Sequence, residues 1–527
     1  MSTATALPVP ASRSFWSSEV VPADQMPTKQ KVIAFAFMCV GMFIALLDIQ
    51  IVSASLRDIG GGLSAGADDV AWVQTSYLIA EIIVIPLSGW LASVMSTRWL
   101  FAVSALGFTF TSLLCGLAWN IQSMIAFRAI QGFLGGSMIP MVFTTAFIYF
   151  NGKQRVIAAS TIGAIASIAP TLGPVIGGWI TDTLSWQWLF YINLVPGLLV
   201  AFAVPALVRV DKPNPGMLKG ADYFSMILMA VFLGCLEYTM EEGPRWNWFS
   251  DNTILATAWI SCLTGIAFIA RSLLVKNPIV DLRALKDRNF ALSSAFSFIT
   301  GIGIFATIYL TPIFLGRVRG FSALEIGTAV FSTGVFQVLS IPLYAFLASR
   351  FDLRWILAAG LALFAVSMWN FAPITHDWGS HELLLPQALR GMGQQLSVPP
   401  IVTLALGGLP PARLKLASGL FNLMRNLGGA IGIAACATVL NDRTNLHFLR
   451  LAEHMNTSNE TVAAAVAAGS DASGSLHQLW AVTYREALTM TFSDAFLIVM
   501  VCFAVALLFV PLLRKISPPT ASSPDAH

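Results

Sequence analysis

Charged side chains are scarce in this sequence. Asp, Glu, Lys and Arg make up 11% of its 527 residues and 56% are hydrophobic, whereas a water-soluble globular chain carries about 25% charged residues. This composition excludes a soluble globular protein, and the lack of a basic stripe argues against nucleic-acid binding. Apolar runs of about 20 residues, long enough to cross a bilayer as helices, recur from Lys31 to Arg514. They predict an all-α polytopic membrane protein built as one bundle.

Sequence signatures of catalysis and of cofactor binding are also missing. The six cysteines all fall within apolar runs, which argues against a disulfide framework or a metal cluster and predicts buried packing residues. The sequence contains no GxxxxGK[ST] phosphate loop, no metal-ligand spacing and no nucleophile–base pair. We therefore expect no cofactor, no bound metal, and neither enzymatic nor ATP-driven activity.

Fourteen transmembrane helices are predicted from the apolar runs. Their ranges are 31–54, 70–93, 99–118, 122–148, 156–180, 187–208, 222–241, 251–273, 290–314, 323–348, 353–372, 383–408, 413–440 and 489–513. The tail 1–30 is rich in Ser, Pro and Ala and is predicted to be disordered. It is expected to be retained, because the apolar run after it is too long for a signal peptide and lacks a cleavage site. Most of the 30 Lys and Arg residues then share one side with both termini. The positive-inside rule places that side in the cytoplasm of a cell whose inner membrane holds the chain.

The two halves of the sequence repeat each other. Three matches occur in the same order, pairing 85–99 (IPL, LAS and RW) with 341–355, 129–140 with 388–399, and 172–177 with 427–432. Because the paired helices cross in the same direction, the halves are predicted to be parallel six-helix repeats with a cavity between them near the bilayer midplane. The predicted domains are a cytoplasmic tail 1–30, a half 31–208, a linker 209–289 with an inserted helix pair (222–241, 251–273), a half 290–513, and a cytoplasmic tail 514–527.

Two connecting segments have a distinctive composition. The external segment 441–488, inside the second half, is rich in Ala, Ser and Thr, so we expect it to be polar and partly helical. The segment 276–288 mixes apolar and basic residues at helical spacing. It is predicted either to lie along the membrane surface or to be a simple connector between the halves.

Four ionisable residues stand out inside predicted helices, namely Asp48, Arg128, Glu81 and Glu237, because an ionised side chain there costs about 2.5–3.5 kcal/mol. Asp48 and Arg128 each lie about six residues from the outer end of their helix, so at about 1.5 Å per residue their depths match. Glu81 lies halfway along its helix with no basic residue within a turn. Desolvation opposes ionisation of a carboxyl there, and exchange of its proton for a substrate would couple transport to a proton gradient.

Structural roles for these residues remain alternatives. Asp48 could cap a helix or form a fixed ion pair, and Arg128 could bind backbone carbonyls. Glu237, four residues from Glu241, is expected near the outer interface.

The second half contributes polar groups but no carboxylate on helices 383–408 and 413–440. This asymmetry predicts that the first half handles protons while the second half shapes the substrate site, although helix packing also explains such groups. The predicted cavity residues are Tyr77, Gln131, Tyr309, Gln387, Arg390, Gln394, Asn422 and Arg425.

The helix predicted over 156–180 carries a pattern of glycine and proline, with Gly173-Pro174 followed by Gly177-Gly178. Gly173 and Gly177 share a face that permits close helix approach, and Pro174 removes an intrahelical hydrogen bond and permits bending. In its context this pattern resembles the antiporter signature of major facilitator drug exporters. The resemblance implies that this helix seals the cavity at the interface between the halves.

The resemblance extends over nearly all of 31–513 and indicates the fourteen-helix drug:proton antiporter branch that includes EmrB- and QacA-like proteins. Its further motifs are Leu-Asp and Ile-Val within 47–52, Arg-Ala-Ile-Gln-Gly at 128–132, and Asn-Pro-Ile-Val-Asp-Leu at 277–282. By this resemblance, Asp48 and Arg128 belong to the proton-relay and substrate-coupling region.

The sequence departs from that branch in three respects. The family carries an acidic residue and then Gly-Arg-Lys after a Gly-x-Leu-Ala motif, but here residues 93–98 hold no carboxylate. The resemblance therefore does not carry over the family's usual charge latch on the inner side. Gln50 and Ser53 stand where Thr and Asn are usual, and Glu81 is an additional acid that part of the branch shares.

Three functions are compatible with these features. The resemblance implies efflux of small hydrophobic toxic compounds in exchange for protons, and the similarity of 276–290 to EmrB-type members implies a periplasmic adaptor and an outer-membrane channel as partners. A dedicated transporter for one metabolite, such as an amino acid, a siderophore or an organic anion, would use the same machinery. A membrane scaffold or sensor that transports nothing would have no need of Asp48, Glu81 and Arg128.

Overall fold

The computed structural model describes residues 25–53, 55–275, 278–455 and 472–515. The predicted tails 1–30 and 514–527, the predicted loop 441–488 and the segment 276–288 each lie partly outside the described residues. All regular secondary structure within the described ranges is helical.

The helices fall into two halves joined by an inserted pair. The first half comprises α1 (Thr28–Ser53), α2 (Leu56–Gly62), α3 (Ala67–Met95), α4 (Thr97–Gly116), α5 (Ile121–Tyr149), α6 (Gly152–Thr183), α7 (Trp188–Tyr191) and α8 (Leu194–Leu207). The inserted pair is α9 (Tyr223–Glu242) and α10 (Asn252–Leu274). The second half comprises α11 (Arg288–Arg317), α12 (Ala323–Leu339), α13 (Ile341–Arg350), α14 (Leu353–Phe371), α15 (Leu384–Leu406), α16 (Pro411–Ala452) and α18 (Ala472–Phe509).

The helix count agrees with the predicted membrane protein. Within the described residues, 13 helical spans are long and apolar enough to cross a membrane. Helix α15 has 23 residues and is largely buried, but it carries Gln387, Arg390 and Gln394 along with Pro399 and Pro400, which lower its hydropathy. Counting α15 gives the predicted fourteen.

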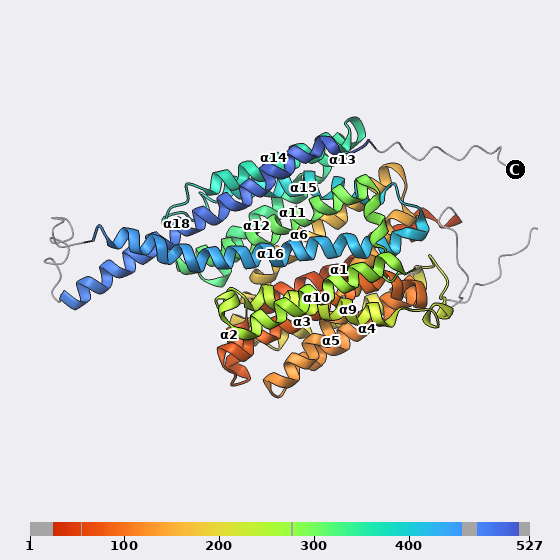
Figure 1. The fold of residues 1–527 in the computed structure, drawn as a ribbon. Helices are drawn as coiled ribbons and strands as arrows, with labels where there is room; N and C mark the ends of the chain where they lie inside the picture. The colour runs from red at the N-terminus through yellow and green to blue at the C-terminus, as the bar shows by residue number, and fades with distance from the viewer. Residues whose placement is uncertain (1–24, 54, 276–277, 456–471, 516–527) are drawn as a thin grey trace, which may run out of the picture.

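The internal repeat of the sequence appears as a repeat of helix crossings. Gly132 on α5 packs against the backbone of Tyr77 on α3, and Gly391 on α15 packs against the backbone of Thr333 on α12. In each half these glycines leave no room for a Cβ atom, so the two helices touch backbone to backbone. In Figure 1, α3 to α5 gather on one side with α9 and α10, and α11 to α15 gather on the other.

Two long helices extend past one end of the bundle. Helices α16 and α18 project beyond the other helices at the left of Figure 1, and we call this the arm end and the opposite end the terminal end. Along the arm, Thr444 donates a hydrogen bond to Thr491 (3.2 Å), and the ring of Phe448 packs on those of Trp480 and Tyr484 with centroids 6.2 and 6.3 Å apart.

The ends predicted for these two helices, at 440 and 489, are therefore 12 and 17 residues short of the ends observed at Ala452 and Ala472. Hydropathy marks where a chain leaves the bilayer, whereas a helix continues as long as a partner packs against it.

Two predicted helices are interrupted. The helix predicted over 323–348 breaks at Ser340, and the helix predicted over 187–208 breaks between α7 and α8. Pro342 and Pro196 follow these breaks. Each proline lies in the first turn of the helix that follows the break, where its missing N–H and the clash of its ring with the preceding turn prevent the two segments from joining as one helix.

The inserted pair lies at the edge of the bundle. Helix α10 buries Ile254, Ser261, Gly265, Phe268 and Ser272, and most of its remaining surface is apolar and exposed. Cys262 on this helix is exposed. Cys39, Cys115 and Cys436 are buried, whereas Cys235 and Cys502 are half-buried. The expectation that all six cysteines are buried was therefore correct for three of them and wrong for Cys262, because composition does not distinguish an apolar run that faces lipid from one that faces protein.

Candidate functional site

A fully buried ion pair joins α1 and α5. Arg128 Nη1 lies 2.5 Å from Asp48 Oδ2, and both side chains are 0% exposed. Arg128 Nε donates to the carbonyl of Val73 on α3 (3.2 Å), and its guanidinium lies 4.1 Å from the ring centroid of Tyr77. The two residues that sequence placed at matching depths are thus in direct contact.

Amide side chains add further hydrogen bonds to this pair. Asn193 Nδ2 donates to Asp48 Oδ1 at 2.7 Å and Gln131 Nε2 donates to the same atom at 3.4 Å, while Gln131 Oε1 accepts from Arg128 Nη1 at 2.9 Å. A buried pair needs such additional bonds because both charges have left water. Asn193 was missed by sequence reasoning, since one polar residue after an apolar run gives no signal of its partner.

A cavity of about 540 Å³ opens toward the arm end between the two halves. Its lining comes from the arm-end parts of α1, α3, α9 and α11 and from the middle of α16, with smaller contributions from α6 and α12. The walls are mostly apolar, and the charged groups among them are Glu81, Glu237, Glu241, Glu242 and Arg245. Both halves and the inserted pair therefore form one central cavity of the size that small-molecule ligands occupy.

Glu81 lies in this cavity wall. Its side chain is 3% exposed and packs against Gly136 on α5, where there is no room for a larger residue. The guanidinium of Arg425 on α16 is close enough to attract the Glu81 carboxylate. Sequence reasoning found no basic residue near Glu81 because this partner comes from the other half of the chain.

One of the eight residues predicted for the cavity lines it, and the other seven do not. Tyr309 lines the cavity. The other seven are packed within the bundle, with exposures of 0 to 6%: Tyr77, Gln131, Gln387, Arg390, Gln394, Asn422 and Arg425. In the second half, Thr333 donates to Gln387 and accepts from Arg390 Nη2 at 2.8 Å. Glu237, expected near the outer interface, lies in the last two turns of α9, is 5% exposed and lines the cavity.

Helix α6, which carries the glycine–proline pattern, lies at the interface between the halves. Gly173 and Gly177 touch the backbone of α1 at Gln50 and Ile51, while Pro174 lines the cavity. Gly178 is buried beside them. On the opposite face, Val175 packs against Gly327 of α12 in the second half.

The halves touch at the terminal end below the cavity. Lys415 Nζ on α16 lies 2.5 Å from Asp211 Oδ2 and 3.2 Å from the carbonyl of Ala92 on α3. Gly89 packs against the backbone of Lys415, and Thr144 shares a hydrogen bond of 2.7 Å with Ser418. These contacts close the terminal end while the arm end is open.

Asp211 supplies the carboxylate that residues 93–98 lack. Besides pairing with Lys415, it accepts from the backbone N–H of Thr97 at 3.1 Å to each carboxylate oxygen, at the first residue of α4. Asp211 follows α8, more than a hundred residues after the position where the family motif carries its acid. A search confined to the local motif could therefore not find it.

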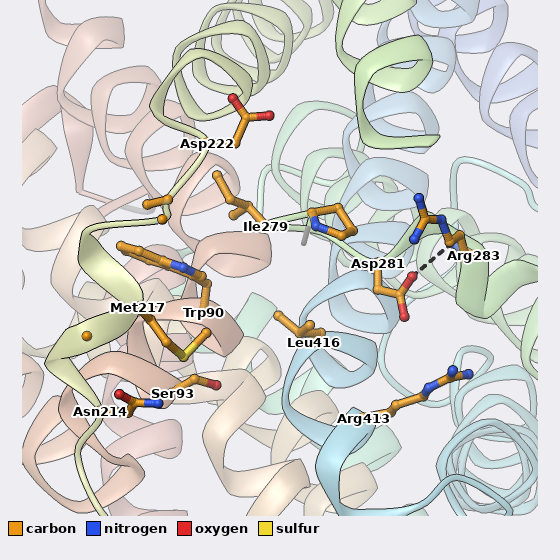
Figure 2. A pocket seen from close by; sticks show the side chains of 14 residues that line it. Trp90, Ser93, Asn214, Met217, Asp222, Ile279, Asp281, Arg283, Arg413 and Leu416 are labelled. Atoms are coloured by element: carbon orange, nitrogen blue, oxygen red, sulfur yellow. Dashed lines mark hydrogen bonds between the residues drawn. The ribbon is translucent and has the colours of Figure 1, made fainter. Parts of the chain in front are cut away.

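A second cavity, of about 690 Å³, lies at the terminal end (Figure 2). Trp90 of α3 and Leu416 and Arg413 of α16 line it together with the linker. The dashed line in Figure 2 is the hydrogen bond from the backbone N–H of Arg283 to Asp281 Oδ1 (3.2 Å), which begins a short 3₁₀ turn, Leu282–Lys286. The described part of 276–288 thus folds against the bundle, with Ile279 and Val280 buried.

Two pseudo-equivalent six-helix halves around one cavity, open at one end and closed at the other, define a multi-pass membrane protein with the architecture of an alternating-access transporter. The Major Facilitator Superfamily model matches residues 38–433, and the chain belongs to this superfamily.

Similar proteins bear names that refer to drug export or resistance. The chain is 38% identical over 435 residues to the colistin resistance protein EmrB of Acinetobacter baumannii, covering 82% of this chain and 85% of that protein. It is 30% identical over 434 residues to the multidrug export protein EmrB of Escherichia coli K12, covering 82% and 84%. The structure is similar to that of the human organic anion transporter MFSD10, with a TM-score of 0.55 at 12% identity, covering 91% of this chain and 100% of that chain. This last likeness supports the fold.

Proposed function

We propose that the chain exports small hydrophobic, toxic compounds in exchange for protons. The observation that carries this proposal is the position of Glu81, a buried carboxyl in the wall of a cavity between two halves, within electrostatic reach of Arg425 of the opposite half. The resistance and export names of the relatives support the substrate class. We also propose the inner membrane as the location with both termini cytoplasmic, which makes the arm end external.

The exchange follows from the charge of one side chain. With Glu81 ionised, its attraction to Arg425 joins α3 to α16 and supports the contacts at the terminal end. A proton entering from the arm end neutralises Glu81 and removes this attraction, so the terminal end opens. The proton leaves to the cytoplasm and a substrate takes its place, and the re-ionised carboxylate favours closure. Each net charge moved contributes about 2.3 kcal/mol per 100 mV of membrane potential.

The buried pair of Asp48 and Arg128 has a separate role in this scheme. It fixes α1 against α5 and keeps a guanidinium close to Glu81 without lining the cavity itself. We assign it to the positioning of the proton site. By the same resemblance, an adaptor and an outer-membrane channel complete the export route, with the arm as the part of the chain that reaches furthest outward.

The test is proton-driven transport in proteoliposomes or inverted vesicles. Glu81→Gln keeps the shape of the side chain and removes its charge, so we expect substrate movement driven by a pH gradient to be lost while the variant still inserts and binds substrate. Glu325→Gln, on the exposed N-terminal turn of α12 at the arm end, is the matched control. Wild-type rates in Glu81→Gln would refute the coupling. If the wild-type protein transported one metabolite and none of a panel of toxic compounds, a dedicated transporter would be favoured.

A further inference from the structure

Helix α9 of the inserted pair forms one wall of the central cavity. Gly234 on α9 leaves room for the side chains of Ile79 and Ile83 of α3, which pack against it. Toward the arm end, Tyr238 stacks on Trp72 with 5.4 Å between ring centroids, and Thr75 donates to Glu242 at 3.4 Å. This packing turns the last two turns of α9, which carry its carboxylates, into the cavity.

The charge in the cavity is strongly one-sided. Glu81, Glu237, Glu241 and Glu242 line it, whereas Arg245 is the guanidinium among the lining residues. Arg245 pairs with Glu242 at 3.7 Å on the rim. Because Arg245 pairs with Glu242 at the rim, the charged lining residues farther inside the cavity are carboxylates. Three of the four carboxylates belong to the inserted helix pair, which is not part of either six-helix half.

Glu237 stands apart from the other carboxylates. It is 5% exposed, and its Oε2 atom is buried with no hydrogen-bond partner among the described residues. Gln74 also lines the cavity and is 9% exposed, and its Oε1 atom is likewise buried with no hydrogen-bond partner among the described residues. Both atoms are acceptors, and buried acceptors are normally satisfied. The cavity is thus short of hydrogen-bond donors on this side, and Phe305 and Tyr309 of the second half add aromatic surface to it.

We propose that this cavity binds a protonated amine with an apolar body, in which an N–H group donates to Glu237 Oε2 and the body lies against Phe305 and Tyr309. The inference rests on the proposed function and names the substrate class for the same cavity. An N–H group is required because the unsatisfied atoms are acceptors, so a quaternary ammonium of the same shape supplies the charge but not the hydrogen bond. The volume of about 540 Å³ accommodates a ligand of this kind.

The test is binding of three matched probes to the full-length protein in nanodiscs of zwitterionic lipid. The probes are 4-phenylbutylammonium, its N,N,N-trimethyl analogue and 5-phenylpentanoate, which share the apolar body and differ in the polar group. We expect the ammonium to bind at least about tenfold more tightly than the trimethyl analogue, and the carboxylate to bind weakest. Glu237→Gln should reduce the ammonium's affinity about tenfold, since a charge-assisted hydrogen bond is lost, and should leave the trimethyl analogue less affected.

A control variant separates local from general charge effects. Asp442→Asn removes one carboxylate from the exposed surface of the arm and should leave all three affinities unchanged. Equal affinities for the three probes, or an unchanged ammonium affinity in Glu237→Gln, would overturn the inference. Exchange of a neutral hydrophobic compound for protons by the wild-type protein, measured in parallel, tests the proposed function alone. If that exchange persists while the probes show no preference, the substrate class is wrong and the export function stands.

Discussion

The ion pair between Lys415 and Asp211 gives the most direct test of how the terminal end is held shut. We consider Lys415→Met, which keeps the length of the side chain and removes its charge. Lys415 and Asp211 are 16% and 15% exposed, so the pair lies between exposed pairs, worth about 0.2–1 kcal/mol, and buried pairs, whose breakage costs about 3–5 kcal/mol. We expect the loss of this ion pair to cost about 2 kcal/mol, because Asp211 keeps its hydrogen bonds from Thr97.

A loss of about 2 kcal/mol changes the ratio of closed to open terminal ends by roughly 30-fold. The assay is the distance between spin labels at positions 29 and 350, both exposed at the terminal end and in different halves. We expect Lys415→Met to add a population with a longer distance. Arg271→Met is the matched control, because Arg271 also pairs with an aspartate, Asp222, but entirely within the linker and inserted pair. An unchanged distance distribution in Lys415→Met would refute the latch.

Three further predictions concern buried and capping charges. Arg128→Met leaves the Asp48 carboxylate buried without its cation and should lower the free energy of unfolding by about 3–5 kcal/mol, seen as a lower melting temperature in detergent. Arg390→Met should be neutral or stabilising in the same assay, because Arg390 Nε and Nη1 have no hydrogen-bond partner among the described residues; a large destabilisation would contradict this. The hydrogen bond from Arg271 lowers the pKa of Asp222 to about 2. Since Arg271 is 43% exposed, solvent screens the pair, and Asp222→Asn should lower the free energy of unfolding by about 1 kcal/mol. This difference should be present above pH 4 and should fade as the pH falls toward 2.

The helices and their repeat could be predicted because both follow from local composition. Apolar length fixes where a chain crosses a bilayer, and small residues at equal spacing, such as Gly132 and Gly391, fix equal crossings in the two halves. The helix ends at Ala452 and Ala472 could not be predicted from the sequence, because contacts between α16 and α18 determine them.

The site was predicted in part for the same reason. Sequence identified Asp48, Arg128 and Glu81 as charges that needed an explanation, and the matching depths of Asp48 and Arg128 correspond to a real contact. The local sequence does not indicate partners that come from distant segments, such as Asp211 for Lys415 and Arg425 for Glu81. A partner of this kind follows only from the way the two halves face each other.

The repeat also explains why one of the two interfaces between the halves can respond to a proton. The offset of 256 residues pairs Glu81 of α3 with Gln337 of α12. Glu81 is within electrostatic reach of Arg425 on α16, whereas Gln337 Nε2 donates to the carbonyl of Gly163 on α6 at 3.2 Å. An amide bonded to a backbone carbonyl does not titrate, so the contact between α12 and α6 persists whatever the proton supply. If Glu81 exchanges the proton, as proposed, the contact between α3 and α16 loosens while its counterpart holds, and the halves pivot about the α6–α12 side.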